Sequence, residues 1–282
     1  MQKHAYLILA HNDRSLLQDL ITCLDDSRND IFVHWDAKSG PVPQLKTTQS
    51  CLYALDKRIE VNWAGYSMVK AEYLLFKEAL AHGPYIYYHL LSGADLPIKS
   101  QSYIHEECER LNGTEFVGFS PASTAEIDFR VQHYFPFSED FRTKNLFKRG
   151  VRFLALKIQD IIRSNRTDIY VKKGSQWCSL TQSFVEYLIT QEKMVETVFS
   201  HTFCPDELFI QTVIINSPFK DRIKNAETEF EGNMRFIKWQ DGELIPIDSD
   251  DLSNLKDSDK WFARKFCGSD RVLIALVKQL CK

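Results

Sequence analysis

Short apolar runs alternate with helical patterns through the first 95 residues, and this alternation constrains the fold more than any other feature. The apolar runs cover 4–11, 31–36, 59–63 and 85–91, and apolar residues recur at helical spacing over 16–24 and 68–82. Strands separated by helices form βα units, in which the strands pair in parallel. We therefore predict an α/β fold with a mainly parallel central sheet flanked by helices.

Polar and aromatic residues stand at the carboxyl ends of these predicted strands. In open α/β sheets, ligands bind beyond those ends, where the strand order switches. The candidates are His11, Asp36, Trp63 and Asp95. Each has a structural alternative: Asp36 and Asp95 could cap the turns that follow them, His11 could be a satisfied strand-end histidine, and Trp63 could be a core residue.

Composition excludes several classes of protein. The chain has 282 residues, 44% of them apolar, which is enough for a sizeable core, and its formal charge is −3. This balance argues against disorder and against nucleic-acid binding. Its apolar runs are shorter than the roughly 20 residues of a membrane-spanning helix, and the first residues do not resemble a signal peptide. We expect a cytoplasmic protein.

The seven cysteines form no CxxC pair, and we interpret them as reduced thiols. His105 lies three residues before Cys108, but no second pair nearby completes a zinc-binding set. We therefore expect no structural metal.

The segment 142–173 is strongly basic. It contains ten basic and two acidic residues, a net charge of +8, which leaves −11 for the rest of a chain whose total is −3. Apolar residues within 146–162 predict an amphipathic helix. Such a helix could lie on an anionic membrane surface or meet an anionic acceptor. The alternative is a solvated basic face on a helix whose apolar stripe packs on the core.

A proline and two carboxylates, at 205–207, begin another predicted helix. Pro205 suits the first turn, and Asp206 and Glu207 favour the positive end of the helix dipole. Both could serve as helix caps. Alternatively, the helix N-terminus could hold one of these carboxylates beside a cleft.

Eight blocks of the chain together resemble the core-2/I-branching β-1,6-N-acetylglucosaminyltransferases and the related peptide xylosyltransferases. The resemblance covers most of the chain and is weakest over 101–173. The blocks are LAHN at 9–12, FVHWD at 32–36, VNWAGYSMVKAE at 61–72, YHLLSGADLPIK at 88–99, GSQW at 174–177, PDE at 205–207, RFIKW at 235–239 and FARKF at 262–266.

This resemblance implies a single GT-A glycosyltransferase domain over 1–282, with a nucleotide-binding half at 1–120 and an acceptor-binding, catalytic half at 121–282. The implied reaction is inverting transfer of a sugar from a UDP-sugar to a hydroxyl of a glycan or glycolipid. N-acetylglucosamine is the expected sugar, with xylose, glucose and galactose as alternatives. The family works without a metal, whereas most GT-A enzymes hold the diphosphate through a cation on an Asp-x-Asp motif. Asp-x-Asp occurs here at 248–250 and 257–259, near the C-terminus, where we expect helix caps or solvated loops instead.

The resemblance also implies residue roles. Glu207 matches the catalytic base and Lys265 the cation that stabilises the departing diphosphate, with Arg264 as a helper. The nucleotide-binding candidates are His11, Asp36, Trp63 and Asp95, and the candidates on the sugar and acceptor side are Trp239, Trp177, Asp206 and Arg130.

One departure weakens the metal-free assignment. The branching enzymes carry an Arg upstream of the last block, but 244–248 reads LIPID, without a basic residue. Diphosphate neutralisation then rests on Lys265 with Arg264 or with a residue of 142–173. A silent nucleotide- or carbohydrate-binding module is the alternative function, and a peripheral membrane or scaffold protein is a third. We expect a bacterial enzyme of surface-polysaccharide or glycolipid assembly, peripheral at the inner face of the cell membrane.

Overall fold

The computed structural model describes residues 2–162, 165–240 and 243–281. A five-stranded sheet with the order β3-β2-β1-β4-β6 lies at its centre. The first four strands pair in parallel, and β6 is antiparallel to β4. The predicted fold class is therefore confirmed. The strands of this sheet are β1 (His4–Ala10), β2 (Asn29–Trp35), β3 (Cys51–Ala54), β4 (Tyr87–Ser92) and β6 (Ser179–Thr181).

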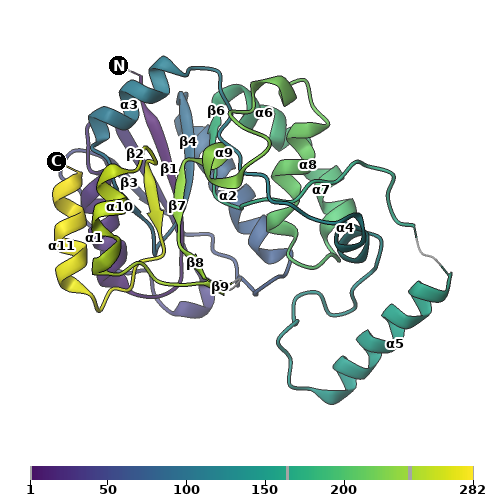
Figure 1. Ribbon diagram of the computed structural model, residues 1–282. Coiled ribbons are helices and arrows are strands. Elements are labelled where there is room, and N and C mark those ends of the chain that lie inside the picture. Colours follow the sequence, from purple (N-terminus) through teal and green to yellow (C-terminus); the bar gives the residue numbers. More distant parts are fainter. Residues whose placement is uncertain (1, 163–164, 241–242, 282) are drawn as a thin grey trace.

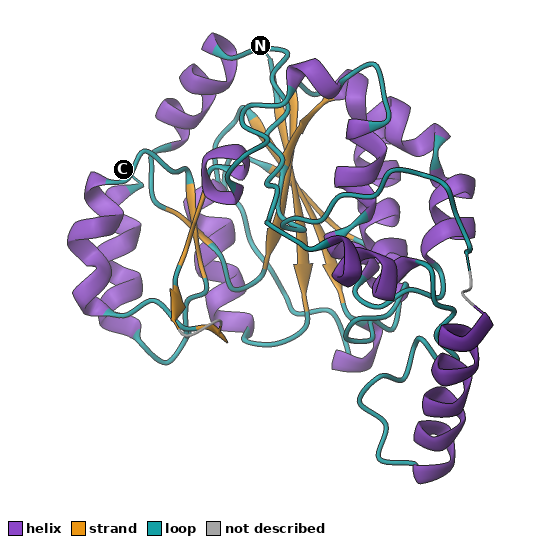
Figure 2. Ribbon diagram, turned by 45° about the vertical axis from the view of Figure 1, so that its right-hand side comes forward, coloured by secondary structure: helices purple, strands orange, loops and turns teal. Residues whose placement is uncertain are grey.

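Helices cover both faces of this sheet (Figures 1 and 2). All seven residues of β1 are buried, which is typical of a parallel strand packed on both sides. Alternate residues of β1 enter different cores. Leu7 packs in the core formed with α2 (Ser67–His82), α6 (Gln182–Thr190), α7 (Glu192–Phe199) and α8 (Phe209–Ile215). Ile8 packs in the core formed with α1 (Arg14–Leu24), α3 (Gln101–Arg110), α10 (Leu252–Asp257) and α11 (Arg271–Leu280).

A second, smaller sheet has the order β5-β10-β7 and lies beside the α1 and α11 side of the molecule (Figure 1). It brings the chain after β4 against the C-terminal part of the sequence, because β5 pairs antiparallel with β10. The strands are β5 (Leu96–Pro97), β7 (Arg235–Ile237) and β10 (Phe262–Arg264), and β8 (Trp239–Gln240) forms a hairpin with β9 (Glu243–Leu244). Two short helices remain, α4 (Thr124–Val131) and α9 (Glu229–Asn233).

The predicted strand over 59–63 is wrong, because the third strand of the sheet is β3 at Cys51–Ala54. Residues 59–63 form a loop whose backbone is bound by the end of β2 and by the residue after Asp36. Ile59 donates its N–H to His34 Nε2 at 2.9 Å and accepts from Ala37 N at 3.2 Å. Because these backbone groups already have partners outside a sheet ladder, the alternating pattern does not form a strand.

The predicted amphipathic helix is confirmed as α5 (Leu146–Ile162). It extends away from the body of the molecule at the lower right of Figure 1. None of its residues is buried, so the alternative in which its apolar stripe packs on the core is wrong. Within the described residues, no helix combines the length and the hydropathy required to cross a membrane. All seven cysteines are free thiols.

Candidate functional site

The carboxyl ends of β1, β2 and β4 meet at one edge of the central sheet. Gly93 donates its N–H to Leu9 O and Asp36 donates its N–H to Ala10 O, both at 2.8 Å. A Cβ atom at Gly93 would lie 2.8 Å from the Cβ of Ala10, so the chain approaches here more closely than a larger residue allows. The segments that follow these strands, with His11, Asp36 and Asp95, are therefore gathered at this edge.

At the end of β2, the structural alternative applies to Asp36 but not to His11 at the end of β1. The carboxylate of Asp36 accepts the N–H of Lys38 at 2.8 Å and caps the turn that follows. Asp36 is buried, whereas His11 is exposed. The His11 side chain makes no hydrogen bond or ion pair with any described residue. Nucleotide binding by these two residues remains a prediction.

Three of the sequence blocks converge around Arg264. Its guanidinium carbon lies 4.1 Å from the ring centroid of Trp177, and its Nε lies 3.6 Å from Asp95 Oδ1. The other carboxylate oxygen of Asp95 accepts the N–H of Ser92 at 2.9 Å. Phe266 donates to Ala94 O at 2.9 Å and ties the two loops together. The predicted residues Asp95, Trp177 and Arg264 thus form one cluster.

The Arg264 guanidinium is enclosed but not saturated with hydrogen bonds. Its Nε and Nη1 have no hydrogen-bond partner among the described residues, and the same is true of Asp95 Oδ1. Burial lowers the pKa of Arg264, and the nearby Asp95 opposes that effect. Burial also raises the pKa of Asp95, and Arg264 opposes it. Buried polar groups are usually paired, so free donors on a buried cation suit an anionic ligand.

Glu207 lies at the end of a 3₁₀ turn, Pro205–Glu207, immediately before α8. Its side chain is 41% exposed, and its Oε2 lies 3.0 Å from Arg130 Nη2. The same guanidinium donates to Phe203 O at 3.0 Å and to Cys204 O at 2.7 Å, and Gly174 donates to Glu207 O at 2.9 Å. The Glu207 carboxylate is thus held in place and remains accessible from solvent, and its role as the base stays a prediction.

Two further carboxyl groups lie behind Glu207. Burial raises the pKa of Asp206 to about 7, and the charge of Glu207 adds to the effect. Burial also raises the pKa of Glu72 well above its ordinary value, with Asp206 contributing, although Gln176 donates to Glu72 Oε1 at 2.7 Å. The enclosed Oδ1 of Asp206 has no partner among the described residues, so Asp206 is a neighbour of the base rather than a helix cap. Sequence reasoning assigned no role to Glu72.

Trp63 lies beside the loop that carries Glu207. It is 49% exposed, which overturns the core alternative. Its ring meets Phe203 edge-on at 5.7 Å, and Cys204 donates its N–H to Ala64 O at 3.1 Å. The guanidinium carbon of Arg142 lies 4.2 Å from the Trp63 ring centroid. A basic residue of 142–173 therefore reaches the candidate site, although the sequence alone did not single out Arg142.

Two predicted residues are not joined to these clusters by any contact among the described residues. Trp239 is 51% exposed on the β8–β9 hairpin. Lys265 is also exposed, and its carbonyl oxygen accepts the N–H of Ile247 at 3.0 Å. The 244–248 stretch thus passes directly beside Lys265, but the roles of Lys265 and Trp239 stay predictions.

The two Asp-x-Asp segments have structural partners. Asp248 caps the 3₁₀ turn Ser249–Asp251 in a reciprocal capping box. Lys238 Nζ lies 2.8 Å from both Asp248 and Asp251, and Lys260 Nζ lies 2.8 Å from Asp259. The expectation of helix caps and surface loops is therefore confirmed for Asp248 and Asp259.

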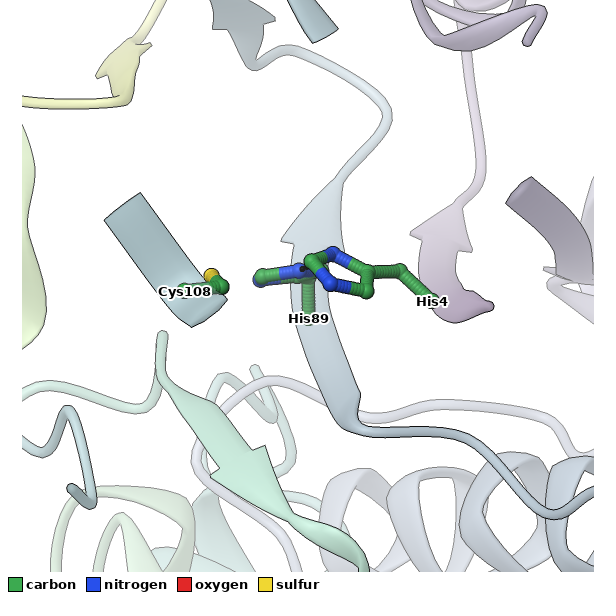
Figure 3. Close-up of side chains that lie close together, drawn as sticks. All are labelled: His4, His89 and Cys108. Carbon is green, nitrogen blue, oxygen red and sulfur yellow. Dashed lines mark hydrogen bonds between the residues drawn. The ribbon is translucent and has the colours of Figure 1, made fainter. Parts of the chain in front are cut away.

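A separate group of potential metal ligands lies away from this edge of the sheet. His4 from β1, His89 from β4 and Cys108 from α3 converge in the buried interior (Figure 3), with their ligand atoms within 4.8 Å of one another. Sequence spacing paired Cys108 with His105 and not with these two histidines, which are far from it along the chain.

Hydrogen bonds connect His4 and His89 with Ser179 and Arg235. Arg235 Nη1 donates to Ser179 Oγ at 3.1 Å, and Ser179 lies 2.7 Å from His89 Nδ1. With Ser179 as the donor to Nδ1, the His89 proton sits on Nε2, which lies 3.0 Å from His4 Nδ1. Burial lowers the pKa of His89, and nearby charges, including Arg235, lower it further. Because a cation would need the protonated Nε2 and would add charge near Arg235, these residues fit a hydrogen-bond chain better than a metal site.

Comparisons with known proteins identify related sequences. The model of the Core-2/I-Branching enzyme family matches residues 4–262. The chain is 22% identical over 290 residues to a Mus musculus beta-1,3-galactosyl-O-glycosyl-glycoprotein beta-1,6-N-acetylglucosaminyltransferase 4, covering 93% of this chain and 61% of that protein. It is 23% identical over 254 residues to Homo sapiens xylosyltransferase 1 (83% and 24%). It is 24% identical over 306 residues to Arabidopsis thaliana beta-glucuronosyltransferase GlcAT14B (98% and 65%).

The chain thus spans less than two thirds of the length of each of these relatives. Among solved structures, mouse xyloside xylosyltransferase 1 in its apo form aligns with a TM-score of 0.34 and 9% identity, over 78% of this chain and 83% of that chain.

Proposed function

The chain belongs to the Core-2/I-branching enzyme family, as its sequence blocks predicted, and we propose that it is a UDP-sugar-dependent, inverting glycosyltransferase of GT-A type. In this proposal it transfers a sugar to a hydroxyl group of a glycan or of a lipid-linked glycan. The nucleotide-binding half is 1–120, and the acceptor-binding, catalytic half is 121–282.

The observation that carries the proposal is the buried guanidinium of Arg264. It stacks on Trp177 and keeps Nε and Nη1 without hydrogen-bond partners among the described residues. A diphosphate oxygen supplies the acceptor that Nη1 lacks, and hydrogen bonds from a guanidinium to phosphate are strengthened by charge. Asp95 lies 3.6 Å from Nε and orients the group. We assign the diphosphate to Arg264 first, with Lys265 as the second cation.

The transfer step follows from the placement of Glu207. The acceptor oxygen forms a bond to the anomeric carbon while the bond from that carbon to the UDP oxygen breaks. Glu207 takes the hydroxyl proton, and UDP leaves with the bonding electron pair. A single base is sufficient for inversion, and fixed positive charge stabilises the leaving group. Arg130 acts by positioning the Glu207 carboxylate.

The remaining roles concern binding. We assign uracil stacking to the exposed ring of Trp63, next to Arg142, and a uridine contact to Asp36, with His11 nearby. Trp239 and Trp177 provide the flat apolar surfaces that sugars require. Asp206 lies against the base, so its contribution to the acceptor side is made through Glu207.

No metal enters the proposed reaction. The Asp-x-Asp segments are engaged as a cap and in ion pairs, and the loop after β4 presents one carboxylate, Asp95, which faces Arg264. A divalent cation on the diphosphate would compete with Arg264 for the same oxygens. EDTA should therefore leave the rate unchanged.

The donor sugar is proposed to be N-acetylglucosamine, after the mouse relative. The other relatives are named for xylose and glucuronic acid, so a donor panel must include these sugars. The proposed setting is bacterial polysaccharide or glycolipid assembly at the inner face of the cell membrane.

The test is a screen of UDP and UDP-sugars for stabilisation against heating, followed by measurement of UDP release. Ligand at about 100 times its Kd should raise Tm by about 5 °C or more. UDP release in the presence of EDTA would support a metal-free transferase. Failure of UDP and of every UDP-sugar to raise Tm would overturn the proposal.

A second candidate function is a silent nucleotide-binding module, which the absence of a basic residue at 244–248 favours. It predicts stabilisation by UDP without UDP release, with or without an acceptor.

A further inference from the structure

Helix α5 is attached to the rest of the protein by a polar face. Lys148 Nζ lies 2.7 Å from Asp140 Oδ2, and Arg152 donates to Asp140 O at 2.9 Å. Gln159 exchanges hydrogen bonds with the backbone of Tyr134, at 2.7 and 2.9 Å. These contacts fix the helix while its apolar residues remain outside the core. The reverse arrangement, with the apolar face packed inward, is the rule for helices of globular proteins.

One side of α5 carries an apolar stripe that is exposed except at Val151, which is half-buried. Its members are spaced at i, i+4, i+7, i+11 and i+14, which places them along one side of a helix. Phe147 is 75%, Leu154 60% and Ile161 81% exposed. Single exposed apolar residues are common, but a contiguous stripe marks an interaction surface. The stripe consists of Phe147, Val151, Leu154, Ile158 and Ile161.

The positive charge of α5 indicates which kind of surface the stripe would contact. Helix α5 contains four basic residues and one acidic residue, a net charge of +3. Arg149 is exposed and forms no ion pair with any described residue, and Lys157 is 61% exposed with Asp160 at 3.8 Å. A second copy of the chain would bring two such basic segments together, which like-charge repulsion opposes. An anionic surface with an apolar interior satisfies both the charge and the stripe.

We propose that α5 docks this protein on an anionic phospholipid membrane. The stripe lies below the headgroups, and the exposed basic residues of α5, Arg149 and Lys157, contact the lipid phosphates. The polar face of α5 is hydrogen-bonded to residues 134–141 and points away from the stripe. The rest of the molecule therefore stays in water when the stripe is inserted.

Aromatic packing connects α5 with the candidate site. The guanidinium carbon of Arg152 lies 4.9 Å from the Phe141 ring centroid, and Phe141 meets Phe203 edge-on at 4.9 Å. Phe203 also contacts Trp63 and precedes the 3₁₀ turn that ends in Glu207. A membrane that holds α5 therefore lies next to the site, which identifies the acceptor class as a lipid-linked glycan. This last step alone rests on the proposed function.

The test is flotation of the full chain with vesicles of phosphatidylcholine, with and without phosphatidylglycerol. We expect binding that requires the anionic lipid and weakens with salt. The double variant Leu154→Ser/Ile158→Ser should bind about tenfold more weakly or worse, because it removes inserted apolar surface. Arg149→Glu/Lys157→Glu should weaken binding by a factor of roughly five or more per residue. The control is Val272→Ser, which removes an apolar residue that is 72% exposed on α11.

The proposal would be overturned if both double variants bound the vesicles as strongly as the wild type. It would also be overturned if the wild type bound neither kind of vesicle. A concentration-dependent dimer that Leu154→Ser/Ile158→Ser abolishes would overturn it in favour of a second copy. UDP release separates this inference from the proposed function. The α5 variants should release UDP from a UDP-sugar as the wild type does, whereas loss of UDP turnover with intact vesicle binding would refute the transferase alone.

Discussion

The guanidinium of Arg130 lies 3.0 Å from Oε2 of Glu207 and also binds the main-chain oxygens of Phe203 and Cys204. One buried cation therefore fixes both the carboxylate and the loop that leads into it. The Glu207 side chain is 41% exposed, so its position depends on this clamp rather than on packing.

Removing the clamp should slow transfer more than it weakens nucleotide binding. We expect Arg130→Ala to lower kcat by roughly 10- to 100-fold, because a displaced catalytic group loses its alignment. Arg130→Lys should recover little, since an ammonium cannot make the same three contacts. Steady-state kinetics and titration calorimetry with UDP check this. Arg110→Ala is the matched control, because Arg110 forms an exposed pair with Glu107 on α3; wild-type kcat in Arg130→Ala would contradict the positioning role.

The buried cation of the diphosphate site makes a different prediction. Arg264→Gln should weaken UDP binding by about tenfold or more, because a charge-assisted hydrogen bond and the buried positive charge are lost. Trp177→Ala should also weaken UDP binding, because the guanidinium loses the ring against which it lies. Lys265→Ala should reduce both UDP affinity and rate. Calorimetry on the three variants ranks these contributions, and unchanged UDP affinity in Arg264→Gln would remove Arg264 from the site.

Stability should depend on pH through Asp206. Burial raises its pKa from 3.8 to about 7. Between these values the native state holds a proton that the unfolded chain has released, so the free energy of unfolding falls as the pH rises through this window. The fall amounts to a few kcal/mol, at about 1.4 kcal/mol per unit of pKa shift, and it is complete above about pH 7.

Urea unfolding near pH 5 and near pH 7 measures this effect. Asp206→Asn should have a flatter pH dependence than the wild type. Part of the slope should remain, because burial also raises the pKa of Glu115 to about 7. An Asp206→Asn protein with the wild-type slope would show that Asp206 ionises normally in the folded state.

Arg235 should matter for stability rather than for catalysis. It is fully buried and donates to Ser179 Oγ and to the main-chain oxygens of Asn233, Leu90 and Cys178. Arg235→Met removes a donor from each of these oxygens, of which Cys178 O still accepts the N–H of Leu90, and we expect a loss of about 3 kcal/mol or more in the free energy of unfolding. Urea unfolding checks this against the exposed control Arg110→Met; equal stabilities would refute the structural role.

Much of the fold could be predicted because buried parallel strands are nearly continuous apolar runs. That pattern located β1, β2 and β4 and the helices between them. It missed β3, an edge strand of four residues without a buried member, and favoured 59–63, where alternation mimics a strand. The partner of that loop is His34, which is 25 residues away from Ile59 and invisible to a local pattern.

The site was predictable where several blocks converge. The blocks that contain Asp95, Trp177 and Arg264 meet in space. Glu207 lies in a 3₁₀ turn just before α8, where the sequence predicted the start of a helix. Glu72 was missed because its burial depends on a contact with Gln176, 104 residues away. Arg142 was missed because ten basic residues share its segment, and only the tertiary structure places this one over Trp63.

The most direct test of the account is the turnover of Glu207→Gln with its preferred UDP-sugar and acceptor, measured beside its affinity for UDP. The variant keeps the size of the side chain and removes its ability to accept a proton from the hydroxyl. We predict UDP binding as in the wild type and a rate of transfer lower by about a hundredfold or more. Near-normal transfer by Glu207→Gln would contradict the assignment of the base, and with it the mechanism proposed for this site.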